Sequence, residues 1–216
     1  MIIGTMLEAL GNTKKAKGFG FAVCAILLTF CSFTAMVAGK RLELLKETVR
    51  KISRVAAFWD PKNSGSAQQW KESQLPAREL GLQLHSIEIS SAENFEAAFK
   101  EAKANSDAVI LMESQFFYSS NQKQLADLAA KTRLPAIYSR GDFVENGGLM
   151  SYGAEQSEPY RRVASMIDKI LKGIKPADIP VEQPTKFELI INLKAAKRIG
   201  LTIPPNVLVR ADRVIK

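Results

Sequence analysis

Short apolar runs recur along the middle of this chain, and each is followed by a segment with helical spacing. The runs are RVAAFW, LQLHSIEI, AVILM, PAIYS and GLMSYG, the first four lying near residues 55, 84, 108 and 137. The connections are long enough for helical crossovers, and strands that alternate with helices form βαβ units with a parallel sheet. AVILM lacks polar alternation, as expected of a strand covered on both faces. The sequence therefore predicts an α/β unit built on a parallel sheet.

Helical segments fill the gaps between these runs. One is expected from about Ser66 to Leu80, although Pro76 should kink or shorten it. Apolar residues from Phe95 to Ala102 follow i, i+3, i+4, i+7 spacing, which predicts a helix packed on the sheet. A third helix is expected over residues 122–132.

The pattern changes after residue 154. A helix is predicted to begin at Ser157, with an apolar face that extends to Leu171, and to stop at Gly173. The Pro-rich KPADIPVEQP then leads into the strand KFELIIN and a helix closed by Gly200. Pro205 marks the start of a last short helix, expected to reach Val214. We therefore expect residues 155–216 to form a separate piece.

The N-terminal segment is apolar and uncharged from Gly18 to Gly39, after a basic flank. That length is close to the roughly 20 residues that cross a bilayer, and the flanking lysines would hold its start on the cytoplasmic side. An export signal and an uncleaved membrane anchor both fit, and no clean A-x-A site decides between them. A buried hydrophobic hairpin is the alternative. We predict export across the membrane, with residues 1–39 as signal peptide or anchor.

Composition excludes several classes of function. The net charge is +8, but no basic run alternates with aromatics, so no nucleic-acid partner is expected. Both cysteines, Cys24 and Cys31, lie in the N-terminal segment, and His85 is the only histidine. A thiolate metal site therefore cannot be assembled after residue 39. His85 lies in LQLHSIEI, whose alternation favours a strand residue on a partly solvated face over a catalytic one. With no G-x-G-x-x-G phosphate loop either, we predict that the chain is not an enzyme and uses no cofactor.

Polar loops follow three of the predicted strands, where an open parallel sheet binds its ligands. They are DPKNSGSA, ESQFF and SRGDF, and the first leads directly into a helix whose free amides favour a carboxylate. Trp59 stands beside the first loop and can stack on a planar ligand. Ser and Asn before a helix are as often simple caps, so capping is an equally weighted interpretation of that loop.

Four stretches resemble one bacterial family. They are GKRLELLKE, RVAAFWDPKN, LPAIYSRGDFVENGGLMSYG and, most specifically, IPVEQPTKFELIINLKAAKRIGLTIPPNVLVRADRVI. The chain from Gly39 to Lys216 is similar to ABC transporter substrate-binding proteins of the type I periplasmic-binding-protein-like class. The resemblance implies two α/β lobes that close on a small solute by hinge motion.

The resemblance also implies a domain arrangement. Residues 40–154 would be the second α/β lobe, a parallel βαβ sheet preceded by an N-terminal hydrophobic helix. Residues 155–216 would return to complete a first lobe that is mostly absent, since Ala38 runs directly into GKRLELLKE.

The resemblance implies a solute-binding component of an ABC-type importer, with permease and ATPase subunits as partners and a periplasmic or extracytoplasmic location. The solute would be small, organic and amino-acid-like. The alternative is a truncated remnant that binds no ligand on its own. The candidate ligand-binding residues are Trp59, Asp60, Asn63, Ser64, Ser66, Glu113, Ser114, Gln115, Ser139, Arg140 and Asp142.

Overall fold

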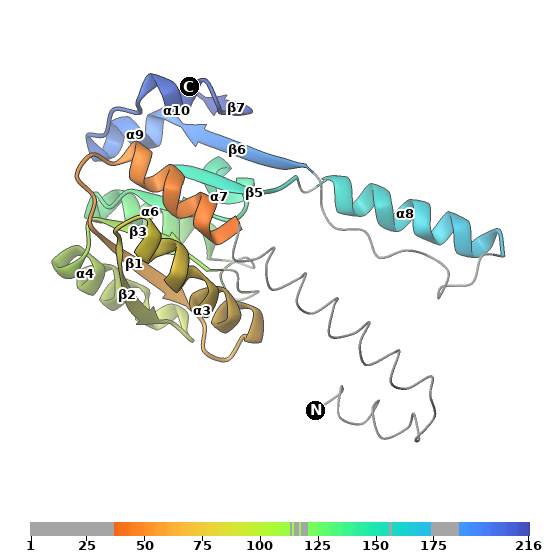
Figure 1. The fold of residues 1–216 in the computed structure, drawn as a ribbon, viewed down its shortest axis with the longest axis horizontal. Helices are drawn as coiled ribbons and strands as arrows, with labels where there is room; N and C mark the ends of the chain where they lie inside the picture. The colour runs from red at the N-terminus through yellow and green to blue at the C-terminus, as the bar shows by residue number, and fades with distance from the viewer. Residues whose placement is uncertain (1–36, 113, 115–116, 118–120, 156, 174–185) are drawn as a thin grey trace.

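One mostly parallel sheet organises the computed structural model, which describes residues 37–112, 114, 117, 121–155, 157–173 and 186–216. Its seven strands run in the order β2-β1-β3-β4-β5-β6-β7 (Figure 1). The strands are β1 (Arg54–Trp59), β2 (Gln83–Glu88), β3 (Ala108–Leu111), β4 (Ala136–Tyr138), β5 (Met150–Ala154), β6 (Phe187–Asn192) and β7 (Arg213–Ile215).

The first five strands confirm the predicted parallel sheet. Each of the neighbouring pairs from β2 to β5 is parallel, as βαβ units require. The last two strands break the pattern, because β6 runs antiparallel to β5 and β7 runs parallel to β6.

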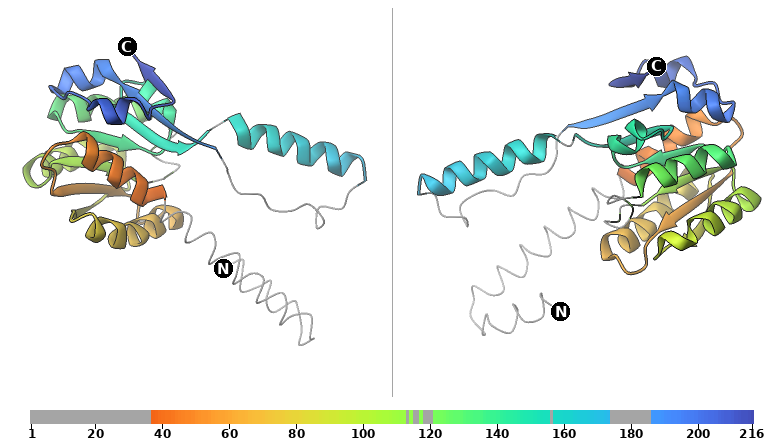
Figure 2. Two further views of the ribbon diagram at one scale, coloured as in Figure 1. Left: turned by 45° about the horizontal axis from the view of Figure 1, so that its top comes forward. Right: turned by 180° about the vertical axis from the view of Figure 1, so that it is seen from behind.

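Helices cover both faces of this sheet (Figures 1 and 2). On one face, a helix over residues 37–48, α3 (Ser64–Glu79) and α10 (Pro205–Leu208) pack on inward side chains such as Val55 and Ile110. On the other face, Phe58 and Tyr138 lie under α4 (Phe95–Asn105), α6 (Gln122–Thr132) and α7 (Gly141–Glu145). A short 3-10 turn, η1 (Ala92–Asn94), precedes α4, and α9 (Leu193–Ile199) follows β6.

The helical periodicity read from the sequence is confirmed in α4. Its buried residues are Phe95, Ala98, Phe99 and Ala102, which lie on one face of the helix. The Phe58 and Phe99 rings meet edge to face at 4.9 Å between centroids. Helix and sheet are therefore joined by an aromatic contact of the kind that adds to area burial.

Pro76 does not shorten α3, contrary to expectation. The helix continues to Glu79, and the backbone N–H of Leu80 then donates to the carbonyls of Pro76 and Arg78. A proline in the last turn removes one helical hydrogen bond. Burial of Ala77 in the core on that side holds the turn in place.

The C-terminal region differs most from the sequence prediction. We expected KFELIIN to lie in a separate piece, but β6 pairs with β5 over five residue pairs and shares its sheet. The predicted last helix also ends early, at Leu208, and Arg213–Ile215 forms β7 at the sheet edge. Strand pairing across the chain, which local sequence does not encode, places both strands.

One helix stands away from the sheet. α8 (Ser157–Leu171) has the predicted bounds and extends from the ends of β5 and β6, clear of the packed layers in all three ribbon views (Figures 1 and 2). Its apolar residues Val163, Ile167, Ile170 and Leu171 are exposed.

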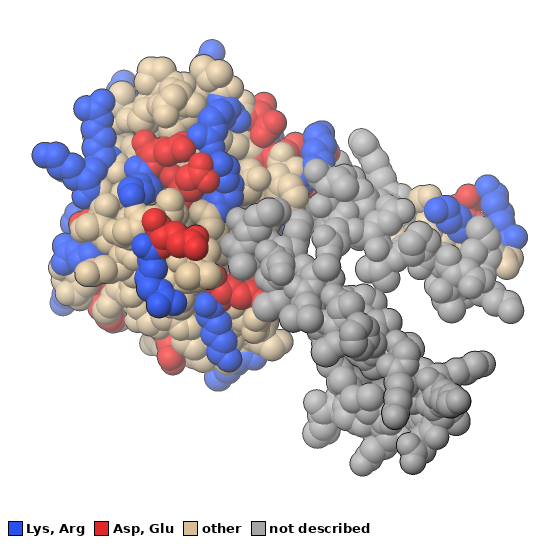
Figure 3. Space-filling view, viewed as in Figure 1, with Lys and Arg blue, Asp and Glu red and all other residues tan. Residues whose placement is uncertain are grey.

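The predicted N-terminal hydrophobic helix, signal or anchor falls almost wholly on residues 1–36, outside the described part of the chain. Among the residues that are described, no helix combines the length and apolar character needed to span a bilayer. Over the face shown in Figure 3, lysine and arginine side chains lie among aspartate and glutamate side chains. That face therefore carries mixed charge and no basic stripe.

Candidate functional site

The candidate loops meet at one edge of the sheet. β1, β3, β4 and β5 are parallel neighbours, so their carboxyl ends and the loops that follow them lie together. Open α/β sheets bind ligands at this edge. The predicted residues fall there into two groups, one after β1 and β3 and one after β4.

Asp60 holds the first group together. Its carboxylate accepts hydrogen bonds from the Ser114 hydroxyl and from the Lys62 amide, both at 2.9 Å, and its own amide donates to Ser66 Oγ at 2.9 Å. Asp60 is only 8% exposed. Through these hydrogen bonds the Asp60 carboxylate joins the loop after β1 to the loop after β3. All of these bonds are made within the protein.

Asn63 caps α3, as the simpler interpretation of DPKNSGSA proposed. Its side-chain oxygen accepts from the Ser66 amide at 2.9 Å, so Asn63 and Ser66 are both engaged in folding the helix start. Ser64 is exposed in the first turn beside them. The first turn of this 16-residue helix still presents the positive end of the helix dipole to the edge.

Trp59 turns toward α3 and the edge strand. Its ring stacks on Trp70 with centroids 6.0 Å apart and planes 10° apart, and its indole N–H donates to Ser86 Oγ at 2.8 Å. Packing between β1, β2 and α3 accounts for these contacts. A contact between Trp59 and a solute stays a prediction.

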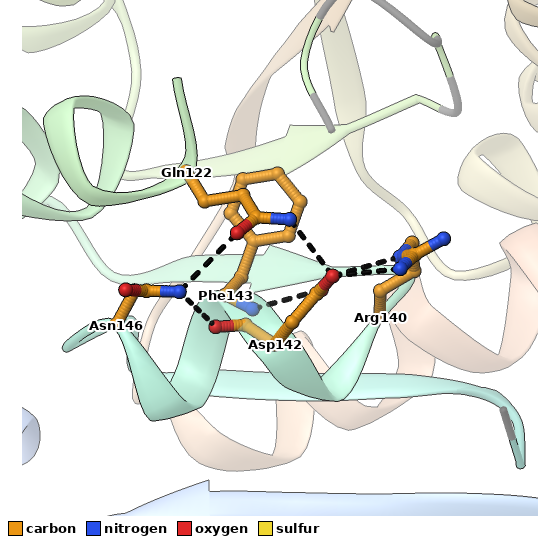
Figure 4. A network of polar contacts seen from close by, with 5 residues as sticks. All are labelled: Gln122, Arg140, Asp142, Phe143 and Asn146. Atoms are coloured by element: carbon orange, nitrogen blue, oxygen red, sulfur yellow. Dashed lines mark hydrogen bonds and ion pairs between the residues drawn. The ribbon is translucent and has the colours of Figure 1, made fainter. Parts of the chain in front are cut away.

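Asp142 is the centre of the second group (Figure 4). Its Oδ2 accepts from Gln122 at 2.8 Å and from the Arg140 guanidinium at 2.7 and 3.1 Å. Its Oδ1 accepts from the Phe143 amide at 3.0 Å, and Asn146 bridges Gln122 and the Asp142 carbonyl. The network fixes the turn between β4 and α7 and joins it to the start of α6.

A hollow of about 270 Å³ opens beside this turn. α7 forms one wall, and β5, β6 and β7 form the floor. Its lining residues are Ser139, Gly141, Asp142, Glu145, Ser151, Gly153, Ala154, Glu155, Glu188, Ile190 and Arg213. The volume is just below the range of about 300–1,000 Å³ that is typical of small-molecule pockets.

Strand register explains why the hollow exists. Gly153 lies opposite Glu188 and Ser151 lies opposite Ile190, so two small residues of β5 share the sheet face that lines the hollow. Gly153 must also lack a side chain, because a Cβ there would lie 1.8 Å from the Ser139 carbonyl oxygen. The strand that floors the hollow is thus held against the end of β4.

Tyr138, the last residue of β4, is fully buried just before this turn. Its ring stacks on Phe143 at 4.6 Å, and its hydroxyl has no hydrogen-bond partner among the described residues. Burial raises the pKa of the Tyr138 hydroxyl, so it stays neutral at physiological pH. The Tyr138 ring therefore packs against the residues of this turn.

The structure thus groups the predicted residues without merging them. Asp60, Asn63, Ser66 and Ser114 form one bonded set, while Ser139 and Asp142 line the hollow and Arg140 braces it. Glu113 and Gln115 lie outside the described residues. Sequence reasoning missed Ser151, Gly153, Glu188 and Arg213 on β5, β6 and β7, and Glu155 just after β5. The small residues in MSYG were the one available signal.

The sequence comparison decides the family. A family described as ABC transporter substrate binding protein matches residues 28–215, which is most of the chain. The chain belongs to that family. Its fold is the type I periplasmic-binding-protein-like fold expected from the resemblance.

Solved structures agree with this assignment. An ABC domain in complex with L-Trp from Streptococcus pneumonia is 27% identical, with a TM-score of 0.76 over 83% of this chain and 60% of that one. A conserved domain protein from Vibrio cholerae has the same fold, with a TM-score of 0.76 at 22% identity over 82% of this chain and 60% of that one.

A curated relative is also similar. An uncharacterized protein of Rickettsia prowazekii (strain Madrid E) is 30% identical over 121 residues, covering 56% of this chain and 40% of that protein. This chain therefore spans 60% or less of the length of each of these three proteins.

Proposed function

We propose that this chain is the solute-binding component of an ABC-type importer and binds a small, amino-acid-like organic solute. The observation that carries the proposal is the polar hollow at the carboxyl ends of β4 and β5, in a chain of a substrate-binding family. The similar Streptococcus structure contains L-Trp.

The proposed partners follow from the family. A permease and an ATPase would receive the solute, and the chain would act outside the cytoplasm, with residues 18–39 as export signal or membrane anchor. In the two-lobe arrangement that the family implies, closure of the first lobe over this carboxyl edge would complete the site. The turn braced by Asp142 would then be the rigid wall against which closure occurs.

A second candidate is a remnant of such a receptor that binds no solute on its own. Its supporting observation is α8, where Val163, Ile167 and Leu171 are exposed although they form an apolar face. Faces of this kind normally pack against another element. β6 does not add to this argument, because Leu189, Ile190 and Ile191 are buried.

Isothermal calorimetry on the full chain separates the two candidates. We expect saturable heat with L-Trp or another amino acid, and none with D-glucose, a neutral solute of similar size that lacks a carboxylate. No heat from any of the twenty amino acids at millimolar concentration would refute autonomous binding and favour the remnant. Heat from glucose equal to that from amino acids would refute an amino-acid-like solute.

A further inference from the structure

The hollow has an excess of negative charge. Four carboxylates line it, from Asp142, Glu145, Glu155 and Glu188, against the single guanidinium of Arg213. Three of the four are paired: Asp142 with Arg140 at 2.7 Å, Glu145 with Arg213 at 2.7 Å, and Glu155 with Lys186 at 2.8 Å. The nearby cations are therefore already engaged.

Glu188 is the exception. Its carboxylate makes no hydrogen bond or ion pair with any residue in the described part of the chain, and its side chain is half-buried. It lies on β6 directly opposite Gly153, and both residues line the hollow. A carboxylate that lines a hollow without an internal partner can accept hydrogen bonds from a bound cation.

The surroundings favour an organic cation over a metal ion. Within the described residues, no group of three or more histidine, cysteine, aspartate or glutamate side chains is placed to hold a metal. The carboxylates that neighbour Glu188 are committed to arginine and lysine. An ammonium group needs only one carboxylate and has three N–H donors, which a polar hollow can receive.

We propose that Glu188 binds the ammonium group of the solute and so selects amines over their deaminated counterparts. The inference rests on the proposed function and assigns a role within the same site. The backbone geometry supports it, because the pairing of β6 with β5 fixes Glu188 over the hollow floor. Residues on strands hold a functional group more precisely than residues on loops do.

Calorimetry with three indole compounds tests the assignment. L-Trp carries both charges, tryptamine only the ammonium and indole-3-propionate only the carboxylate. Each is titrated into the unchanged full chain, into Glu188→Gln, which keeps the shape and removes the charge, and into Glu79→Gln. Glu79 is an exposed residue at the far end of α3 and serves as the matched control.

We expect Glu188→Gln to weaken L-Trp and tryptamine binding by about tenfold to a hundredfold, the range for a charge-assisted hydrogen bond. Indole-3-propionate should bind both proteins alike, and Glu79→Gln should match the unchanged chain for all three compounds. Thermal melts of Glu188→Gln should coincide with those of the unchanged chain, since no bond within the described structure is lost.

Each contrary outcome has a distinct meaning. Equal L-Trp affinity in Glu188→Gln and the unchanged chain refutes the role of Glu188 and leaves solute binding intact. Tighter binding of indole-3-propionate than of L-Trp to the unchanged chain also refutes it. Absence of binding by all three compounds and by all other amino acids refutes the proposed function, and the assignment of Glu188 with it.

Discussion

Gly153→Ala is the substitution whose effect the structure defines most sharply. The new Cβ would lie 1.8 Å from the Ser139 carbonyl oxygen, whereas ordinary contact begins at 3.4 Å. Relief therefore needs a displacement of about 1.6 Å between the ends of β4 and β5. The obstructing atom belongs to the backbone, so no side-chain rotation can provide it.

The cost follows from what such a displacement disturbs. β4 and β5 are joined through the pairs Ile137–Met150 and Tyr138–Ser151, immediately before the clash. Overpacking in a close-packed interior costs about 1–3 kcal/mol and at times more, and a backbone clash belongs at the upper end. We expect a loss of about 3 kcal/mol in unfolding free energy, which in a chain of this size lowers Tm by roughly 6–12 °C.

Urea titration followed by tryptophan fluorescence measures this loss, with Gly65→Ala as the control. A Cβ at Gly65 meets only the side-chain oxygen of Asn63, at 3.2 Å, and alanine favours helix by up to about 1 kcal/mol. The control should therefore change stability by less than about 1 kcal/mol. A Gly153→Ala variant within 1 kcal/mol of the unchanged chain would show that β4 and β5 are not held together as described.

Three further outcomes follow from single contacts. Asp60→Ala leaves the Ser114 hydroxyl and the Lys62 amide without their acceptor, so it should lower the unfolding free energy by about 1–3 kcal/mol in urea, and a loss under about 0.5 kcal/mol would contradict the described network. Burial alone raises the pKa of Asp107, but hydrogen bonds from the Ser53 and Arg54 amides and the Ser53 hydroxyl, together with the Arg54 charge, outweigh it and hold that pKa below its ordinary value. Because the pKa of Asp107 is lower in the folded state, this stabilisation is present above the unfolded-state pKa and is lost as pH falls through the folded-state pKa. Acid titration from about pH 5 downward should therefore lower the unfolding free energy of the unchanged chain more steeply than that of Asp107→Asn. Parallel curves for the two proteins would refute this role of Asp107. The side chain of Leu171 is 81% exposed, so Leu171→Ser should change the unfolding free energy from thermal melts by no more than about 0.5 kcal/mol. A larger loss would mean that the apolar face of α8 packs against another element.

The parallel part of the fold could be predicted because its signals are local. Apolar runs separated by helix-length connections define β1 to β5, and α6 and α8 have the bounds expected from their periodicity. The partner of β6 could not be predicted. KFELIIN is apolar enough to join any sheet, and its antiparallel pairing with β5 depends on how the chain returns after α8.

The candidate site could likewise be predicted only in part. Loops after parallel strands can be read from the sequence, so Ser139 and Asp142 could be predicted to lie at the carboxyl edge of the sheet, where they line the hollow. The hollow itself depends on register across three strands, which puts Ser151, Gly153 and Glu188 on one face. No motif in the linear sequence marks these residues as pocket residues. Only the strand pairing shows that they line the same hollow.

An amide chemical-shift titration of the isotope-labelled full chain with L-Trp tests the central claim most directly. If the solute binds at the carboxyl edge of β4 and β5, the amides of Gly141, Gly153 and Glu188 should shift in a saturable way, with the residues at the far end of α3 unaffected. Saturable shifts confined to other elements, or no saturable shift at millimolar L-Trp and every other amino acid, would contradict a solute site in this hollow.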